Sequence, residues 1–258
     1  MKCLYPLLCL ALMGCNRPGA YPTNLPARGL NPQGISANVQ SQAQNAQAVA
    51  DLYPLAPGHQ WRYELRQKQN GEPRPKVKTL QMRTEALPAD GPVMQAVLRR
   101  GYPDSTVVPT PTLARLYNDR VELSRYQAEL LSDFDLPAAV AAEVTAQTQG
   151  ANEGQNFVTI LKAPFEPGQH WEGRLFKGGT ETVKVIGWES VTVPAGTFRA
   201  LKIEHHKQYS NDKSDFLYYW YAPNVGMVKL YEELTVYYGQ WLNYESTGEL
   251  ISHTPPAP

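Results

Sequence analysis

The sequence has no excess of charge of either sign, because 24 Lys and Arg residues are balanced by 24 Asp and Glu residues. A chain without a basic field has no electrostatic footprint for nucleic acid or for anionic lipid headgroups. Long hydrophobic runs are also scarce. The apolar segment Cys3–Met13 is shorter than the roughly 20 residues that a membrane-spanning helix needs. These features argue against a nucleic-acid-binding protein and against a membrane span in this segment.

Cysteine is scarce too, with three residues in the chain, and Cys3 and Cys9 lie in the apolar segment that follows Lys2. A basic start, an apolar run and a small residue before the cut are typical of a secretory signal. The ending Leu-Met-Gly-Cys resembles the lipobox of bacterial lipoproteins. This resemblance implies that residues 1–14 are a signal peptide and that Cys15 carries a three-chain lipid anchor, palmitate included. An ordinary signal peptide is the alternative. With one mature cysteine, disulfides, cysteine-based zinc sites and cysteine nucleophiles are excluded.

Large apolar residues are rare in residues 15–50, which consist mostly of Asn, Gln, Pro, Ala, Gly and Ser. Such a segment buries too little surface to offset the entropy lost on ordering, and it predicts a flexible tether. Its end, Ser41–Ala50, could form a short polar helix. A random-coil tether would hold the rest of the protein roughly tens of ångströms from the membrane. By resemblance to enterobacterial sorting rules, Asn16 beside the anchor indicates the outer membrane, facing the periplasm.

The remaining chain predicts one β-rich domain over residues 51–253 and a Pro-rich tail over residues 254–258. Short segments alternate apolar and polar residues, and turn-forming residues separate them, which is typical of an antiparallel sheet, sandwich or barrel. We expect a mainly β fold: a curved antiparallel sheet, a half-barrel or a β-sandwich, with one or two short helices. The clearest helix is expected over Pro137–Thr148. The expected strands are residues 61–67, 77–84, 93–100, 113–118, 120–126, 157–161, 171–176, 183–193, 198–206, 216–221, 226–238 and 240–244.

One short sequence pattern occurs twice. Pro54–Trp61 and Pro164–Trp171 share Pro-apolar-x-Pro-Gly-x-x-Trp, and each copy leads into an expected strand. In both copies a rigid Pro-Gly turn would deliver a tryptophan into the core. Two copies of the pattern suggest two structurally related halves.

Recognisable catalytic and metal-binding motifs are missing. The sequence contains no Gly-x-Ser-x-Gly, no phosphate-binding glycine loop and no His-Glu-x-x-His. Adjacent His205 and His206 would point to opposite faces of a strand, so they cannot hold one metal together, and we interpret His205 as a hydrogen-bonded core residue. His59 and His170 are interpreted as polar turn residues, and His253 as part of the tail. The sequence predicts a protein without enzymatic activity, metal or cofactor.

Pairs of acidic residues have structural explanations. Asp133 and Asp135 precede the expected helix and are expected to cap it. Glu232 and Glu233 alternate across an expected strand, and we expect them to be solvated or paired with Lys229. Neither pair is predicted to be a catalytic carboxylate pair.

Aromatic residues gather in the C-terminal part of the chain. The expected strand 216–221 is apolar or aromatic at every position, so both of its faces must be covered. Packing is the ordinary explanation, because aromatic side chains dominate β cores. The alternative is an apolar ligand groove. For that alternative the candidate ligand-binding residues are Trp188, Phe216, Tyr218 and Trp220.

Three sequence blocks carry a family resemblance. They are Tyr53–Tyr63, the Val-Pro-Ala-Gly-Thr-Phe block Val193–Phe198, and the Trp-Tyr-Ala-Pro-Asn-Val-Gly-Met-Val-Lys block Trp220–Lys229. Together they resemble a family of uncharacterised bacterial envelope lipoproteins. The resemblance implies a curved antiparallel sheet of half-barrel kind, similar in shape to periplasmic lipoprotein carriers. It brings no catalytic residues, because the blocks are turns and core anchors.

The expected function is that of a lipid-anchored protein of the bacterial cell envelope. It would bind, without catalysis, either an envelope protein partner or an apolar small molecule. A structural or assembly scaffold without a ligand cavity is the alternative, and an envelope hydrolase is a third hypothesis. Nucleic acid is not an expected partner.

Overall fold

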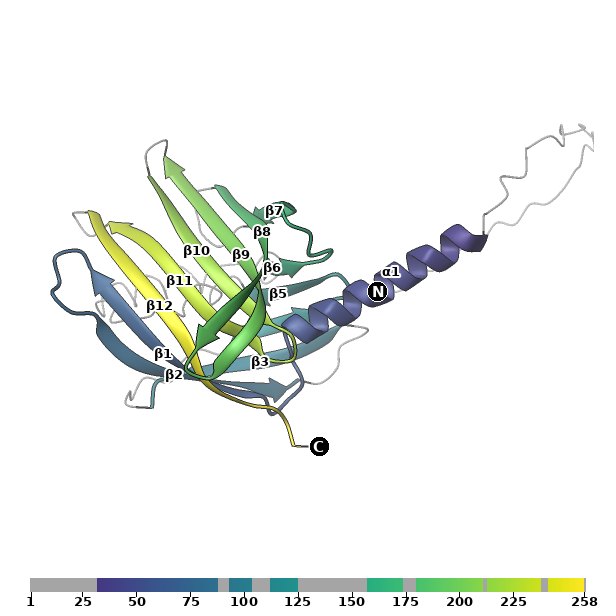
Figure 1. Cartoon of the computed structure of the whole chain (residues 1–258), viewed down its shortest axis with the longest axis horizontal. Helices are drawn as coiled ribbons and strands as arrows, with labels where there is room; N and C mark the ends of the chain where they lie inside the picture. Colours follow the sequence, from purple (N-terminus) through teal and green to yellow (C-terminus); the bar gives the residue numbers. More distant parts are fainter. Residues whose placement is uncertain are drawn as a thin grey trace, which may run out of the picture.

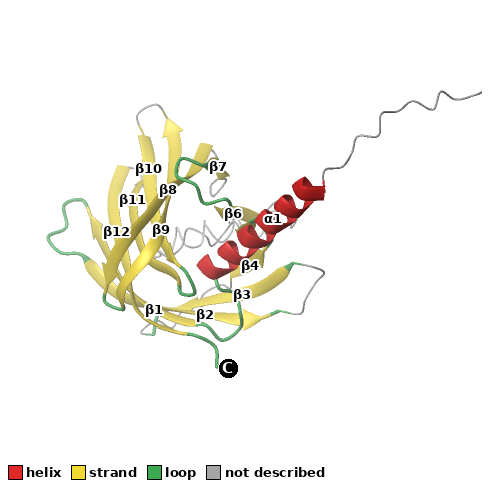
Figure 2. Ribbon diagram, turned by 45° about the vertical axis from the view of Figure 1, so that its right-hand side comes forward, coloured by secondary structure: helices red, strands yellow, loops and turns green. Residues whose placement is uncertain are grey.

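Twelve β-strands form one antiparallel sheet in the computed structural model, which describes residues 32–87, 93–103, 112–124, 157–173, 180–210, 213–237 and 241–257 (Figure 1). The strand order is β6-β5-β4-β3-β2-β1-β12-β11-β10-β9-β8-β7. The sheet curves into a nearly closed barrel with one helix beside it (Figure 2). The prediction of a mainly β fold with a curved antiparallel sheet is confirmed.

The bounds of the elements agree with most of the expected strands. They are α1 (Pro32–Leu52), β1 (Gln60–Gln69), β2 (Lys76–Ala86), β3 (Met94–Gly101), β4 (Thr112–Leu116), β5 (Arg120–Ser124), β6 (Phe157–Lys162), β7 (His170–Gly173), β8 (Thr180–Val193), β9 (Gly196–Ser210), β10 (Lys213–Ala222), β11 (Gly226–Tyr237) and β12 (Trp241–Thr254). Residues 1–31, with the predicted signal peptide and Cys15, lie outside the described residues, as do the predicted helix Pro137–Thr148 and its caps Asp133 and Asp135.

The last strand is longer than predicted. The sequence pattern ended it at Tyr244, whereas β12 continues to Thr254 and pairs with β1 along its length. The pattern is hard to follow because the inward positions are small: Ser246 is buried, and Gly248 packs between side chains of β1 and β11. Small residues at these positions allow close approach of neighbouring strands. His253, assigned to the tail, is therefore a strand residue.

Part of the segment assigned to a flexible tether is helical. α1 covers Pro32–Leu52 and includes the short helix expected over Ser41–Ala50. Ala and Gln favour helix, and the final turn gains tertiary packing because Val49 and Leu52 are fully buried. The turn before β11 holds this end in place, since Asn224 N donates to Asp51 O at 2.7 Å. In the part of the chain that the structure describes, no helix has the length and apolar content to cross a membrane.

The inner face of the sheet forms the main core. Along β1, Trp61, Tyr63 and Leu65 point inward and are buried, while the residues between them face outward. Tyr63 also donates a hydrogen bond from its hydroxyl to Met227 O at 2.9 Å. This bond joins β1 to β11 across β12, so it helps fix the curvature of the sheet.

The hairpin of β8 and β9 bends back over the sheet (Figure 1). The register shifts between Val185 and Gly187, and Gly187 has a φ of 141°, which favours glycine. Beyond this bulge the hairpin reaches β12, where Ala195 N donates to Leu250 O at 2.9 Å. Val191 and Val193 of this part of the hairpin are buried.

The two Pro-Gly-x-x-Trp turns precede β1 and β7. These are the first strands, in chain order, of β1–β6 and β7–β12, which form the two halves of the strand order. Gly58 and Gly168 have φ values of 98° and 90°. Trp61 Nε1 donates to Val225 O, and Trp171 Nε1 donates to Thr159 O at 3.0 Å. The two turns thus have the same local design, with a positive-φ glycine and a buried tryptophan whose indole N–H is satisfied by a carbonyl.

The close packing at Gly248 gives a test of the barrel core. Gly248→Ala is expected to lower the free energy of unfolding by about 1–3 kcal/mol, as overpacked core positions do. The added Cβ would lie 2.8 Å from Leu230 Cγ and 2.8 Å from Leu65 Cδ2. Urea denaturation measures the change, and Thr247→Ala on the outward face is the control, expected to stay within about 0.5 kcal/mol of the unaltered chain. Equal stability of both variants would contradict the tight packing.

Candidate functional site

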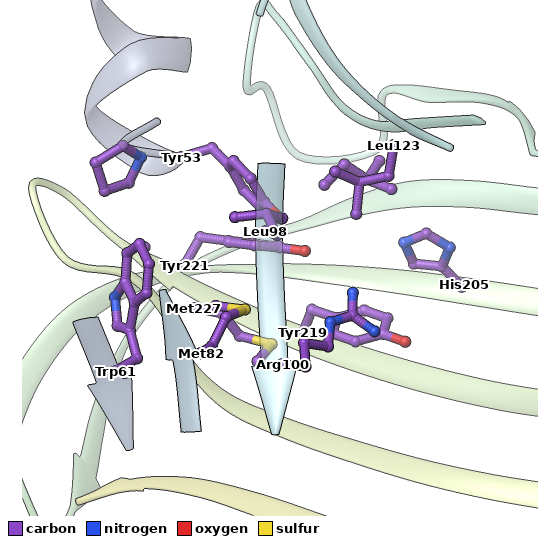
Figure 3. Close-up of a pocket in the computed structure, with 13 residues that line it drawn as sticks. Tyr53, Trp61, Met82, Leu98, Arg100, Leu123, His205, Tyr219, Tyr221 and Met227 are labelled. Atoms are coloured by element: carbon purple, nitrogen blue, oxygen red, sulfur yellow. The ribbon is translucent and has the colours of Figure 1, made fainter. Parts of the chain in front are cut away.

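A cavity lies on the inner face of the sheet (Figure 3). Strands from both halves of the sheet order contribute to its wall. Its volume is about 40 Å³, enough for about three water-sized groups. The lining residues are Tyr53, Pro54, Trp61, Met82, Leu98, Arg100, Leu123, Ile160, His205, Tyr219, Tyr221, Gly226 and Met227. The wall is mostly apolar or aromatic, and Arg100 and His205 are its strongly polar groups.

The aromatic strand β10 contributes to the cavity with one face only. Tyr219 and Tyr221 point inward and line the cavity, as the period of two along a strand requires. Phe216, Tyr218 and Trp220 have the opposite parity and do not line it. Both faces of β10 are aromatic, and each face makes contacts of its own.

The predicted ligand-binding residues of β10 lie on its outward face. Phe216 stacks on His206 with ring centroids 4.5 Å apart. Lys202 Nζ lies 4.5 Å from the ring centroid of Tyr218 and 4.8 Å from that of Trp220, in cation–π geometry. These contacts between neighbouring strands occupy the rings. A groove on this face that takes an apolar ligand stays a prediction.

Trp188, the fourth candidate, lies apart from the cavity, near the bend of the β8–β9 hairpin. It is 38% exposed, and the Arg199 guanidinium lies 5.3 Å from its ring centroid. With Phe198 and Pro223 it borders a shallow surface depression. The structure thus separates Trp188 from the inner-face cavity.

His205 is the polar residue at the far end of the cavity wall, and only 1% of it is exposed. Its Nδ1 lies 2.8 Å from Glu181 Oε1, and its ring stands edge-on to Tyr219. An ionised carboxylate only accepts hydrogen bonds, so Nδ1 then carries the hydrogen. The prediction that His205 is a hydrogen-bonded core residue is confirmed. No protein atom that the structure describes hydrogen-bonds to its other nitrogen, Nε2.

Arg100 enters the cavity wall from β3 and is 9% exposed. Burial raises the pKa of Tyr53 to about 12, against the opposing influence of the Arg100 charge. Burial likewise raises the pKa of Tyr63 and Tyr221 well above 10, and the Arg100 charge again opposes the rise. These tyrosines keep their hydroxyl protons at neutral pH. The Arg100 guanidinium therefore lies near three phenols that are neutral at this pH.

The DUF3108-like family matches residues 180–234, which is less than half of the chain. The match runs from β8 into β11 and includes the blocks Val193–Phe198 and Trp220–Lys229. No curated protein matches the chain.

Two crystal structures are similar to this chain. One is described as an exported protein with a YmcC-like fold from Bacteroides fragilis, with a TM-score of 0.48 and 17% identity over 79% of this chain and 99% of that chain. The other is described as a lipoprotein from Parabacteroides distasonis, with a TM-score of 0.44 and 16% identity over 79% of this chain and 98% of that chain.

Further charged residues are buried beside the cavity. Lys207 in β9 lies opposite Glu181 of β8 and opposite Asp215 of β10. Glu232 was expected to be solvated or paired with Lys229, and this is wrong, because it is fully buried and accepts a hydrogen bond from the Tyr219 hydroxyl at 3.3 Å. Residue 232 falls on the inward parity of β11, so its carboxylate needs buried partners. Lys229 pairs instead with Glu249, at 3.0 Å.

A stack of three rings lies where β1 meets β12. His59, Trp61 and His253 have ring centroids 5.2 to 5.5 Å apart and nearly parallel planes. His59 Nδ1 and His253 Nε2 are 2.9 Å apart and share a hydrogen bond. His59 is therefore more than a polar turn residue, and His253 is not a tail residue. Among the described residues no group of three His, Cys, Asp or Glu side chains is arranged to hold a metal.

The sequence contains a weak signal for Arg100 and Glu181, two buried charged residues that the sequence analysis did not single out. Arg100 shares parity with Ala96 and Leu98 on β3, and Glu181 shares parity with Val183 and Val185 on β8. A charged residue in register with apolar inward positions is a candidate buried group.

The histidine pair predicts a pH-dependent stability. Burial lowers the pKa of His253 below 6.5, and burial together with the charge of His253 lowers the pKa of His59. The unfolded chain then binds more protons than the folded chain, so the stability from this pair is present above about pH 6.5 and is lost as the pH falls toward the folded pKa values. We expect the urea concentration at the midpoint of unfolding to decrease when the pH is lowered from 7.5 to 5.5.

His253→Phe keeps an aromatic ring in the stack but removes one titrating partner. The drop of the urea midpoint over the same pH range is expected to become smaller in this variant. An unchanged drop would show that other groups cause the acid sensitivity.

Proposed function

We propose that this protein is a lipid-anchored binding protein of the bacterial cell envelope that holds a small apolar molecule, without catalysis, in the cavity of its barrel. The lipobox-like ending at Cys15 supports the anchor and the envelope location. Asn16 supports the outer membrane, facing the periplasm. The membrane is then a partner through the N-terminal lipid alone.

The inner-face cavity is the observation that carries the binding role. Ligand sites are typically concave and mostly apolar, with a few placed polar groups. Here Trp61, Tyr219, Tyr221 and neighbouring aliphatic side chains form the wall, while Arg100 and His205 supply the polar groups. Because the wall draws on both halves of the strand order, small changes in curvature would change the size of the site.

The composition of the cavity wall supports binding over catalysis. His205 and Glu181 form a carboxylate–histidine pair, the arrangement that positions a general base. A hydrolase of the nucleophilic type also needs a Ser, Thr or Cys within reach of that base. Within the described part of the chain, no such residue lines the cavity. The His205–Glu181 pair then serves recognition.

A protein partner is the second candidate function, and Trp188 is the feature that favours it. This tryptophan is 38% exposed beside Arg199 and Phe198 at the surface depression. Exposed tryptophan and arginine are enriched in protein interfaces. In this alternative the barrel is a scaffold, and the cavity only completes its packing.

Native mass spectrometry of the full chain, purified from the envelope of a bacterial host, tests the binding role. We expect a non-covalent adduct that organic extraction removes. Leu98→Phe enlarges a side chain of the cavity wall and is expected to reduce the adduct several-fold. Tyr218→Ala, on the outward face of β10, is the matched control and should keep it.

The two candidate functions differ in this experiment. Absence of an adduct from the unaltered chain and from both variants would contradict the apolar-ligand role. Crosslinking in the envelope, with and without Trp188→Ala, would then test the protein-partner role. An adduct that persists in Leu98→Phe but is lost in Tyr218→Ala would move the site to the outward face.

A further inference from the structure

We infer that His59 and His253 form a binding site for one soft monovalent metal cation, Cu⁺ or Ag⁺, held between His59 Nδ1 and His253 Nε2 against the face of the Trp61 ring. The inference goes beyond the proposed function and needs no ligand in the inner-face cavity. It starts from these two imidazole nitrogens, which lie 2.9 Å apart although the two residues are 194 positions apart in the sequence.

The two imidazoles meet edge to edge. Their planes differ by 6°, and their centroids, 5.2 Å apart, are farther from each other than the two nitrogens, which are 2.9 Å apart. Each nitrogen therefore lies on the ring edge that faces the other histidine. In a pair of neutral imidazoles one of these nitrogens carries a hydrogen and the other a lone pair. Moving that hydrogen to the second nitrogen of its own ring leaves two lone pairs facing each other, with no net release of a proton.

Trp61 supplies a third contact for a cation at this position. Its ring is stacked on both imidazoles, with centroids 5.4 and 5.5 Å away and planes tilted by 15° and 18°. A cation between the two nitrogens would therefore lie within about 6 Å of the Trp61 centroid, the range of cation–π attraction, for which tryptophan is the best ring. Trp61 is buried, and its Nε1 donates to Val225 O, so the ring is fixed in place.

The main chain holds both histidines. Thr84 N donates to His59 O, and His59 N donates to the Thr84 hydroxyl, both at 3.0 Å. His253 lies in β12 directly opposite Trp61 of β1. Strands position functional side chains more precisely than loops do.

Binding requires a small movement of one ring. Bonds from imidazole nitrogen to a metal are about 2.0–2.1 Å long, so in-line binding would widen the separation of the two nitrogens by about 1 Å. His253 is partly exposed and lies one residue before the end of β12, whereas His59 is buried. We therefore expect His253 to make this movement.

The number and kind of donors select the cation. Structural Zn²⁺ takes four ligands, and Ca²⁺ and Mg²⁺ take oxygen ligands. Here two nitrogens face each other, and among the described residues no third His, Cys, Asp or Glu side chain joins them in a metal-binding group. Cu⁺ and Ag⁺ have filled d shells and accept two ligands in line. A single positive charge also suits two neutral imidazoles and an aromatic face better than a double charge, which would need a carboxylate partner.

A cation at this site would join the two ends of the globular chain. His59 precedes β1 and His253 is near the end of β12, so the ion would act as a clip across the seam between these strands. Clips that close long loops give the largest stabilisation in theory. Because the unfolded chain does not bring the two rings together, the cation would bind the folded state preferentially.

Titration of the purified full chain with silver nitrate tests the inference, in a chloride-free buffer and with free thiols blocked by N-ethylmaleimide. Isothermal titration calorimetry is expected to show one Ag⁺ per chain, bound on the order of 10-fold or more tightly than Zn²⁺. The urea midpoint is expected to rise with Ag⁺. Tryptophan fluorescence is expected to decrease on binding, and Trp61→Phe should remove this decrease.

His253→Phe keeps an aromatic ring and removes one ligand. It is expected to weaken Ag⁺ binding by at least about 100-fold, since loss of even an outer-shell partner costs about 10- to 100-fold in metal affinity. His170→Phe is the matched control, because His170 is an exposed histidine in the second Pro-Gly-x-x-Trp turn. It should keep the affinity and the rise of the urea midpoint.

A second measurement covers the case in which His253→Phe does not fold. Diethyl pyrocarbonate modifies accessible unprotonated histidines, and mass spectrometry of the peptides locates the modified residues. In the unaltered chain Ag⁺ is expected to protect His253 several-fold and to leave His170 unprotected, because a metal-bound nitrogen has no free lone pair.

The outcomes decide the inference independently of the proposed function. Ag⁺ binding that is unchanged in His253→Phe, or equal protection of His170 and His253, overturns the site. Tighter binding of Zn²⁺ than of Ag⁺ overturns the choice of a soft monovalent cation. Absence of Ag⁺ binding also overturns the inference and leaves the histidine pair as a hydrogen bond across the seam. None of these results changes what native mass spectrometry shows about an apolar adduct.

Discussion

The pairing of β1 with β12 is the constraint on which the rest of the structure depends. The ladder runs from Gln60↔Thr254 to Gln69↔Tyr244, so it joins the two ends of the globular chain. Every other neighbouring strand pair along the sheet, apart from this seam, joins elements adjacent in the chain order. Closing so long a loop costs conformational entropy, which the ladder and the buried residues beneath it must offset. The two walls of the cavity face each other because this seam holds.

Much of the fold follows from local pattern, and most of the site does not. Alternation of apolar and polar residues identifies strands such as β1 and β9, because a half-buried strand imposes a period of two. The same rule does not identify the second half of β12, because Ser246 and Gly248 occupy inward positions there and allow close packing. It also cannot show that His59 meets His253 or that His205 meets Glu181, since these contacts depend on pairing across the sheet.

The candidate residues of β10 show what can and cannot be inferred from amino-acid composition. The sequence correctly indicates that both faces of residues 216–221 must be covered, but it cannot tell which face meets the cavity. In the structure Tyr219 and Tyr221 face inward, whereas the outward rings pack against Lys202 and His206. A lysine over an aromatic ring contributes about 0.5–2 kcal/mol, depending on how far the pair is desolvated, so the outward face is stabilised without any ligand. Parity relative to the curved sheet, which only the fold supplies, decides between the two sets.

The docking of α1 has a mechanical consequence. A helix of 21 residues is about 32 Å long and behaves as a stiff rod. Its last turn is fixed to the barrel through Val49, Leu52 and the Asp51 carbonyl, so the rod and the barrel turn together. If the chain is anchored ahead of this rod, the helix sets a standoff distance from the bilayer. The end of the barrel that contacts the last turn of α1 stays attached to the rod, which a flexible chain could not ensure.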